Sequence, residues 1–179
     1  EAIVLGFNGT ITGNATGGNG TMVNVSTSGG SSPITIDNSS VSADGGEAFM
    51  TAVNGTISGT ATGGNGGDVA LTTSNDNATI TISNSTVTAD GGSANITGNG
   101  TATGGNGGNI NIITLNDNSD ITIDPSTVSA NGGDATVVNG TATSGAGGNI
   151  VITTGNATFG VGSSIVILDS CVTANGGTA

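Results

Sequence analysis

Short runs in which Val, Ile or Leu alternates with Ser, Thr or Asn recur along the whole chain, as in residues 80–88, ITISNSTVT. Such alternation is the period-two pattern of strands with one buried face. The runs are rich in β-branched residues and are interrupted by glycine too often for a helix to propagate. The pattern therefore predicts an all-β protein.

The same order of motifs occurs four times. Each copy contains an apolar pair, a second pair of isoleucines, a Val-x-Ala motif and a closing glycine pair. In chain order the first pairs are Val23/Val25, Val69/Leu71, Ile110/Ile112 and Ile150/Ile152, and the isoleucine pairs are Ile34/Ile36, Ile80/Ile82, Ile121/Ile123 and Ile165/Ile167. The Val-x-Ala motifs are Val41/Ala43, Val87/Ala89, Val128/Ala130 and Val172/Ala174. The copies span residues 1–46, 47–92, 93–133 and 134–177 and are 41 to 46 residues long, and we assign residues 1–179 to one domain.

Repeats of this length with short strands and Gly/Asn-rich turns cannot bury their apolar faces alone and must stack on their neighbours. The sequence therefore predicts a parallel β-solenoid. We expect two coils per repeat, one from the strand-rich half and one from the half of variable length. Eight coils would form a rod of about 40 Å. A single large coil per repeat is the alternative, and periodicity does not separate the two.

The composition narrows the possible functions. The chain has no Lys, Arg, His, Trp or Tyr, 35 glycines and twelve acidic residues. Without cations it has no internal side-chain salt bridges, so backbone ladders and stacked side chains must supply its stability. Nucleic acids and anionic lipids are bound through Lys and Arg, so neither is an expected partner. No run approaches the ~20 apolar residues of a membrane span, so we expect no membrane insertion.

Three carboxylates in the third copy, Asp117, Asp120 and Asp124, are the only candidate catalytic group. Paired carboxylates can hydrolyse glycosidic bonds. Here no His, Lys, Arg or Tyr accompanies them to bind substrate or to stabilise a transition state. We therefore interpret them as solvated turn residues and expect no enzymatic activity and no catalytic site.

Residues 63–71, GGNGGDVAL, match the calcium-binding nonapeptide GGxGxDxUx. Calcium sites of that type need tandem copies every nine residues, whereas this stretch returns only once per repeat. Met22, Asn109 and Asn149 also replace Asp68 in the other copies. We interpret the stretch as a tight turn and expect neither a metal nor another cofactor.

N-glycosylation sequons, Asn-x-Ser/Thr, are twice as frequent as random placement of the same residues would give. They begin at twelve asparagines: Asn8, Asn14, Asn19, Asn24, Asn38, Asn54, Asn77, Asn84, Asn95, Asn99, Asn139 and Asn156. An acceptor asparagine must be exposed and outside the cell. The NGT at Asn8, Asn54, Asn99 and Asn139 precedes each glycine-rich stretch and would be exposed if it forms a surface turn. Such a composition is also typical of solenoid corners without glycans.

Thr-x-Thr recurs at Thr60/Thr62, Thr101/Thr103 and Thr141/Thr143, a pattern compatible with an ordinary threonine ladder or with an ice-binding face.

The single cysteine, Cys171, replaces a Ser or Thr on the face opposite Val172. It is either a plain substitution in a polar ladder or an accessible thiol that links subunits.

The pattern GGNGGNINIIT…DITIDPSTVSANGGDA, within residues 104–135, resembles the repeats of filamentous-haemagglutinin-like surface proteins. The resemblance extends over all four copies. It implies a right-handed parallel β-helix forming an extracellular rod, often an adhesin, and offers no catalytic residues to transfer. The family's N-terminal secretion region is not recognisable here, and the dense sequons are not part of its pattern.

The first residues of the chain match those after each repeat boundary, and Thr178-Ala179 restart the pattern. No atypical polar cap is recognisable at either end, although soluble solenoids usually carry one. We therefore expect an extracellular, cell-surface structural protein that stacks head-to-tail on copies of itself into a glycosylated filament or sheath. The alternative is an adhesion or ligand-binding rod, including an ice-binding one, either capped or part of a longer surface protein.

Overall fold

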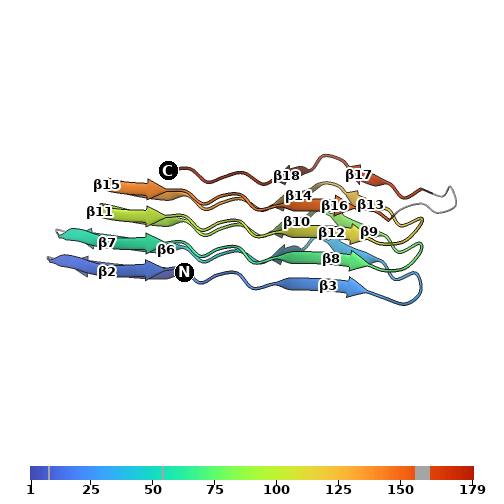
Figure 1. Cartoon of the computed structure of the whole chain (residues 1–179), viewed down its shortest axis with the longest axis horizontal. Helices are drawn as coiled ribbons and strands as arrows, with labels where there is room; N and C mark the ends of the chain where they lie inside the picture. Colours follow the sequence, from blue (N-terminus) through green and yellow to red (C-terminus); the bar gives the residue numbers. More distant parts are fainter. Residues whose placement is uncertain (8, 54, 156–161) are drawn as a thin grey trace.

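The computed structural model describes residues 1–7, 9–53, 55–155 and 162–179. This part of the chain contains strands and no helix, so it includes no helix that could cross a membrane. Every strand pairing is parallel, and the chain winds as stacked layers with its two ends at opposite ends of the stack (Figure 1). The predicted parallel β-solenoid is confirmed.

Three four-stranded sheets form one side of each layer. The first contains β3 (Val23–Thr27), β8 (Val69–Thr73), β12 (Ile110–Thr114) and β16 (Ile150–Thr153). The second contains β4 (Ile34–Asp37), β9 (Ile80–Ser83), β13 (Ile121–Ile123) and β17 (Ile165–Ile167). The third contains β5 (Ser40–Ser42), β10 (Ser85–Thr88), β14 (Ser126–Ser129) and β18 (Cys171–Thr173). We call this part of the molecule the three-sheet lobe.

A six-stranded bent sheet forms the other side, which we call the bent-sheet lobe. It contains β1 (Ala2–Phe7), β2 (Thr10–Thr16), β6 (Ala48–Val53), β7 (Thr56–Thr62), β11 (Ala94–Thr103) and β15 (Ala135–Thr143). In the first two copies the chain runs out along one strand and back along the next. In the last two copies one longer strand, β11 or β15, makes the whole excursion, and β11 pairs with both β6 and β7.

The register corrects the expected coil number. Val69 pairs directly with Val23 of the preceding copy and with Ile110 of the following one, so consecutive copies are consecutive layers. Each repeat is therefore one large coil with two lobes, not two coils. The stack of four coils is about 19 Å high rather than 40 Å. Periodicity missed this because it records which residues recur, not which halves of a repeat stack on each other.

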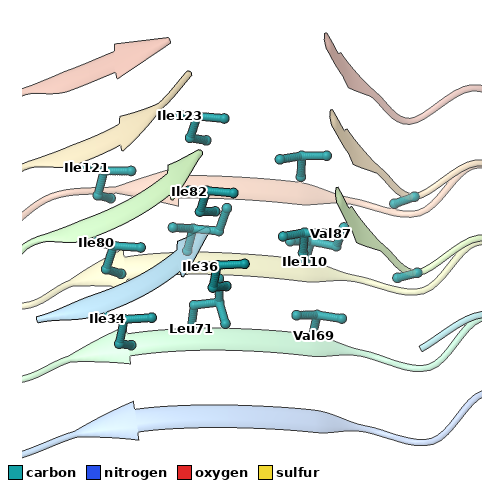
Figure 2. Packing of buried hydrophobic residues seen from close by; sticks show 14 of the residues in the cluster. Ile34, Ile36, Val69, Leu71, Ile80, Ile82, Val87, Ile110, Ile121 and Ile123 are labelled. Carbon is teal, nitrogen blue, oxygen red and sulfur yellow. The ribbon is translucent and has the colours of Figure 1, made fainter. Parts of the chain in front are cut away.

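The core of the three-sheet lobe consists of the predicted aliphatic columns (Figure 2). Leu71, Ile82 and Ile112 have no exposed surface. Aligned residues of successive copies pair in register, because identical side chains stacked at strand spacing fill the interior evenly. Corners are closed by buried polar side chains: the Thr73 hydroxyl donates to the Ala78 carbonyl at 2.9 Å.

The bent-sheet lobe has its own smaller core of alanines around Met50, Ile57 and Ile96. Its tip is shorter in the later copies. The pairing offset falls from 46 residues at Ile96/Met50 to 41 at Asn99/Ser58. The third coil is therefore narrower than the second at the tip.

A glycine waist joins the two lobes. We define it as residues 17–20 and 43–46 and their equivalents in the later coils. Its two chain passes touch backbone to backbone: Gly46 N–H donates to the Gly18 carbonyl at 2.7 Å, and Gly64 N–H donates to the Gly46 carbonyl at 2.8 Å. Bonds of this kind alternate between the two passes up the whole stack. The interpretation of residues 63–71 as a tight turn was wrong, because these glycines are extended and leave no room for a side chain between the passes.

Candidate functional site

The two ends of the stack expose strands and core side chains. β3, β4 and β5 lie at one edge of their sheets, and β16, β17 and β18 lie at the other. Ile121 and Ile123 are fully buried, whereas Ile165 and Ile167, which pair with them, are each 43% exposed. The difference arises because no coil covers the fourth one. Edge strands expose backbone N–H and C=O groups that could pair with a further strand layer.

Glycines mark both ends in a specific way. A Cβ added to Gly64, Gly105 or Gly145 would lie 1.8–2.0 Å from a carbonyl oxygen of the preceding coil. Gly18 occupies the same position in the first coil, where an added Cβ meets no described atom within 4 Å. At the other end, a Cβ added to Gly176 would be no closer than 3.6 Å to a described atom. A Cβ added to its counterpart Gly132 would lie 2.1 Å from the Gly145 carbonyl oxygen. Gly18 and Gly176 thus lack side chains where the isolated stack has room for them.

Side-chain ladders also run between coils. Asp44 accepts the Asp90 N–H at 2.8 Å, Asp90 accepts the Asn131 N–H at 2.6 Å, and Asn131 accepts the Asn175 N–H at 2.9 Å. A similar ladder joins Asn19, Asn65 and Asn106. These carboxamides and carboxylates accept hydrogen bonds from backbone N–H groups of the waist in the next coil.

Two exposed carboxylates have lowered pKa values. Hydrogen bonds from the backbone N–H and the hydroxyl of Thr178, at 2.7 and 2.9 Å, lower the pKa of Asp134. The Ser83 hydroxyl, 2.7 Å from the Asp37 carboxylate, is the main cause of a lowered pKa for Asp37. Both effects are bonds between successive coils, and both favour the ionised carboxylate.

The structure describes nine of the twelve sequon asparagines, and Asn8, Asn54 and Asn156 lie outside the described residues. Eight of the nine are exposed and Asn95 is half-buried: the exposed ones are Asn14, Asn19, Asn24, Asn38, Asn77, Asn84, Asn99 and Asn139. Asn38, Asn77 and Asn84 have positive φ angles of 47°, 58° and 47° at corners. Asparagine tolerates this conformation, so those three positions have a local structural reason independent of any glycan.

The NGT motifs are not equivalent to one another. Asn99 and Asn139 pair with each other and with Ser58 inside the bent sheet, whereas Asn54 falls four residues before Ser58. Asn99 and Asn139 are therefore exposed strand residues and not turn residues. The shortening of the lobe placed the same tripeptide at a different point of the coil.

The Thr-x-Thr motifs form two parallel columns on the outside of the bent-sheet lobe. Thr60, Thr101 and Thr141 pair in register, as do the threonines two residues further on. The Thr60 hydroxyl donates to Asn14 at 2.7 Å. The hydroxyls of Thr101 and Thr141 bond to no described residue, in contrast to Thr86, whose hydroxyl bonds to Ser40 at 3.0 Å. This face therefore presents hydroxyls to solvent.

Two of the candidate acidic residues, Asp120 and Asp68, accept hydrogen bonds from the following coil. Asp120 accepts hydrogen bonds from the backbone and hydroxyl of Ser164 at 2.7 and 2.8 Å. Asp68, from the nonapeptide match, accepts the N–H and carboxamide of Asn109 at 2.9 and 3.0 Å. Among the described residues no three His, Cys, Asp or Glu side chains gather into a group that could hold a metal ion, and this includes Asp117, Asp120 and Asp124.

Cys171 pairs with Thr127 in the third sheet and is an exposed free thiol. It lies on the wall of an open hollow of about 540 Å³ at the corner where β10, β14 and β18 begin. The lining consists of residues 84–86, 125–127 and 169–171. The wall is mainly Ser, Thr and Asn, so the hollow offers hydrogen bonds rather than an apolar pocket.

An apolar patch on the outside of the bent-sheet lobe was missed by the sequence analysis. Its residues are Ile3, Leu5, Phe7, Phe49 and Val53, and we call it the lateral patch. Ile3, Leu5 and Phe7 alternate with inward-facing residues and are 55%, 65% and 74% exposed. The available signal was the uninterrupted run AIVLGF at residues 2–7, in which the outward positions are apolar instead of Ser, Thr or Asn.

Comparison with protein-family models, with curated proteins and with solved structures finds no match to this chain.

Proposed function

We propose that this protein is an extracellular structural subunit that stacks head-to-tail on copies of itself into a glycosylated surface filament or sheath. The observation that carries the proposal is the pair of terminal glycines. Gly18 and Gly176 occupy positions where inner coils require glycine for backbone contact with the next coil. In the isolated stack nothing requires glycine at either position. A second copy placed in register would make both contacts.

Stacking also buries the open core. With Ile165 and Ile167 each 43% exposed, covering them as Ile121 and Ile123 are covered would contribute about 1 kcal/mol per side chain. The strand edges would gain backbone hydrogen bonds at the same time. The contact joins two different ends of the molecule, so it does not close and extends into a fibre.

The junction requires one local adjustment. Thr178 takes the first position of a further coil, where its carbonyl accepts the Ala135 N–H at 2.8 Å. Glu1 and Ala2 of an incoming copy would occupy this same place. Thr178 and Ala179 must therefore move aside when a second copy stacks.

The surface supports an extracellular location. The described sequon asparagines are exposed at eight of nine positions, which is the access that glycosylation needs. The side chains around these asparagines are mostly short and uncharged. Asn99 and Asn139 stand next to each other on adjacent coils, so glycans there would line one face of a filament.

The test of stacking is the substitution Gly18→Ala, which adds one methyl group at the free end. The isolated chain has room for it, so folding and thermal stability should be unchanged or slightly improved. Filaments seen by cryo-electron microscopy should disappear, because the methyl would press against the backbone of the second copy. Mass spectrometry of wild-type filaments should identify this chain, with glycans attached, as the repeating subunit.

A second pair of variants checks the apolar contact. Ile167 and Val151 are both 43% exposed, but Ile167 belongs to the core column and Val151 faces outward. Ile167→Asp should abolish filaments, whereas Val151→Asp should leave them intact. Filaments that persist in both Gly18→Ala and Ile167→Asp would refute the proposal.

The second candidate is an adhesion or ligand-binding rod, including an ice-binding one, and the threonine face favours it. The solvent-facing hydroxyls of Thr101 and Thr141 lie in register on adjacent strands of the bent sheet. Such a rod would shape growing ice crystals or adsorb to a solid ligand as a monomer. Loss of that activity in Thr101→Ala, with full activity in Gly18→Ala, would favour this candidate over the filament.

A further inference from the structure

The lateral patch is compact and continuous. Ile3 pairs with Phe49, Leu5 with Thr51 and Phe7 with Val53, so the outward side chains of two adjacent strands form one surface. It extends for about 13 Å along the strands. Above it, Asn95 and Thr136 continue the Ile3/Phe49 column as polar residues, so the apolar surface ends at the second coil. Exposed patches of this kind mark interaction sites.

Charge is distributed unequally between the two lobes. Residues 2–16, 48–62, 94–103 and 135–143 of the bent-sheet lobe contain no charged side chain. Glu1, Glu47 and Asp134 lie at the base of its strands, next to the waist. The other nine carboxylates belong to the waist and the three-sheet lobe. The lateral patch therefore lies on the neutral half of a molecule with a net charge of −12.

We propose that the lateral patch is an interface between two copies of this chain lying side by side. A second copy can approach through this lobe without bringing carboxylates together, and no cation is available in the chain to relieve such repulsion elsewhere. A cationic partner would be drawn to the nine carboxylates of the waist and the three-sheet lobe. Two identical patches can also face each other across a two-fold axis, the commonest arrangement of soluble dimers.

The size of the patch sets the strength of the contact. An exposed apolar patch of this type covers a few hundred Å², below the roughly 800 Å² per partner of a standard stable interface. Pairing of single chains should therefore be weak. In a filament the patch would recur on every subunit, and the summed contacts would hold two filaments together. The contact does not depend on stacking and exists in the unstacked chain.

The test separates side-by-side pairing from stacking by starting from Ile167→Asp, which blocks the ends. Sedimentation equilibrium of this chain should show a concentration-dependent dimer. Adding Leu5→Thr and Phe7→Thr should weaken that dimer at least tenfold, since these are the two most exposed side chains of the patch. Val138→Thr is the matched control, because Val138 is 67% exposed on the same lobe but outside the patch.

Cross-linking gives a direct measure of proximity. In a Cys171→Ser background, Leu5→Cys should form disulfide-linked dimers under mild oxidation, and Val138→Cys should form far fewer. A chain that stays monomeric at all concentrations, a dimer unaffected by the two threonine substitutions, or equal cross-linking at Leu5 and Val138 would overturn the proposal. Single unpaired filaments formed by the Leu5→Thr/Phe7→Thr chain would leave stacking supported while confirming the role of the patch.

Discussion

The glycine waist makes a sharp prediction about Gly63→Ala. The added Cβ would lie 1.8 Å from the Gly92 carbonyl oxygen, whereas Cβ atoms essentially never approach another heavy atom closer than 3.0 Å. The two passes would have to separate by more than about 1 Å, which is the scale of backbone shift that overpacking produces. That movement would lengthen the bonds from Gly92 N–H to Gly64 and from Gly105 N–H to Gly92, now 2.8 and 2.9 Å.

The magnitude follows from these terms. Overpacking costs about 1–3 kcal/mol, and each weakened hydrogen bond costs about 1 kcal/mol. Replacing glycine by alanine restricts the unfolded chain, which offsets about 0.4–1 kcal/mol. We expect a net loss of about 3 kcal/mol in the free energy of unfolding, equivalent to a Tm roughly 10 °C lower for a chain of this size.

The assay is urea and thermal unfolding followed by far-ultraviolet circular dichroism at a concentration too low for assembly. Gly18→Ala is the control, because it makes the same chemical change in the same motif with no described atom within 4 Å of the new Cβ. It should be neutral or slightly stabilising. If the two variants unfold within about 0.5 kcal/mol of each other, the waist is not held by glycine-specific backbone contact and the reasoning fails.

Three further predictions follow from the ends and the core. Removing Thr178 and Ala179 should speed filament growth in light-scattering assays, because the incoming copy no longer has to displace them; slower growth would contradict the proposed junction. The folded-state pKa of Asp134 is below its unfolded value, so its stabilising contribution is present above about pH 4 and is lost as pH falls through the folded pKa. Asp134→Asn should remove that part of the acid-dependent loss of stability in unfolding titrations, and an unchanged pH profile would show that the Thr178 bonds do not matter. Leu71→Ala should lower the free energy of unfolding by about 2–5 kcal/mol, because Leu71 is fully buried. Val25 lies in the same column but is 36% exposed, so Val25→Ala should lower it clearly less in the same chemical unfolding assay.

Much of the fold could be predicted because it is encoded locally. The alternation around Val69 and Leu71 identifies inward positions, and the recurrence of that pattern in each copy identifies which residues stack. Parallel in-register pairing follows, since any slip by one residue would turn a whole aliphatic column towards solvent. The register of the Thr-x-Thr columns and the exposure of Cys171 were predictable for the same reason.

The candidate site was less predictable, because its properties arise from contacts between parts of the chain that no local pattern relates. The sequence shows that Gly18 and Gly176 belong to repeated glycine motifs. Only the structure shows that an added Cβ at Gly18 or Gly176 would have room, whereas one at the equivalent glycines of the other coils would clash with a backbone carbonyl. Likewise, the sequence of residues 2–7 predicts an ordinary strand. Their outward side chains form the lateral patch because β1 pairs with β6, which brings Phe49 and Val53 beside Ile3 and Phe7.

The amino-acid sequence by itself determined the class of structure. Period-two alternation predicts strands with one buried face, and four aligned copies predict that these strands stack in parallel as a solenoid. Because the chain has no Lys, Arg or His, no side-chain salt bridge stabilises it. The tertiary structure decided that each repeat is one coil with two lobes rather than two coils. The physical reason is the waist, where glycines let two distant passes of the backbone bond directly to each other. Such a contact depends on what lies across the coil, and periodicity along the chain does not encode it.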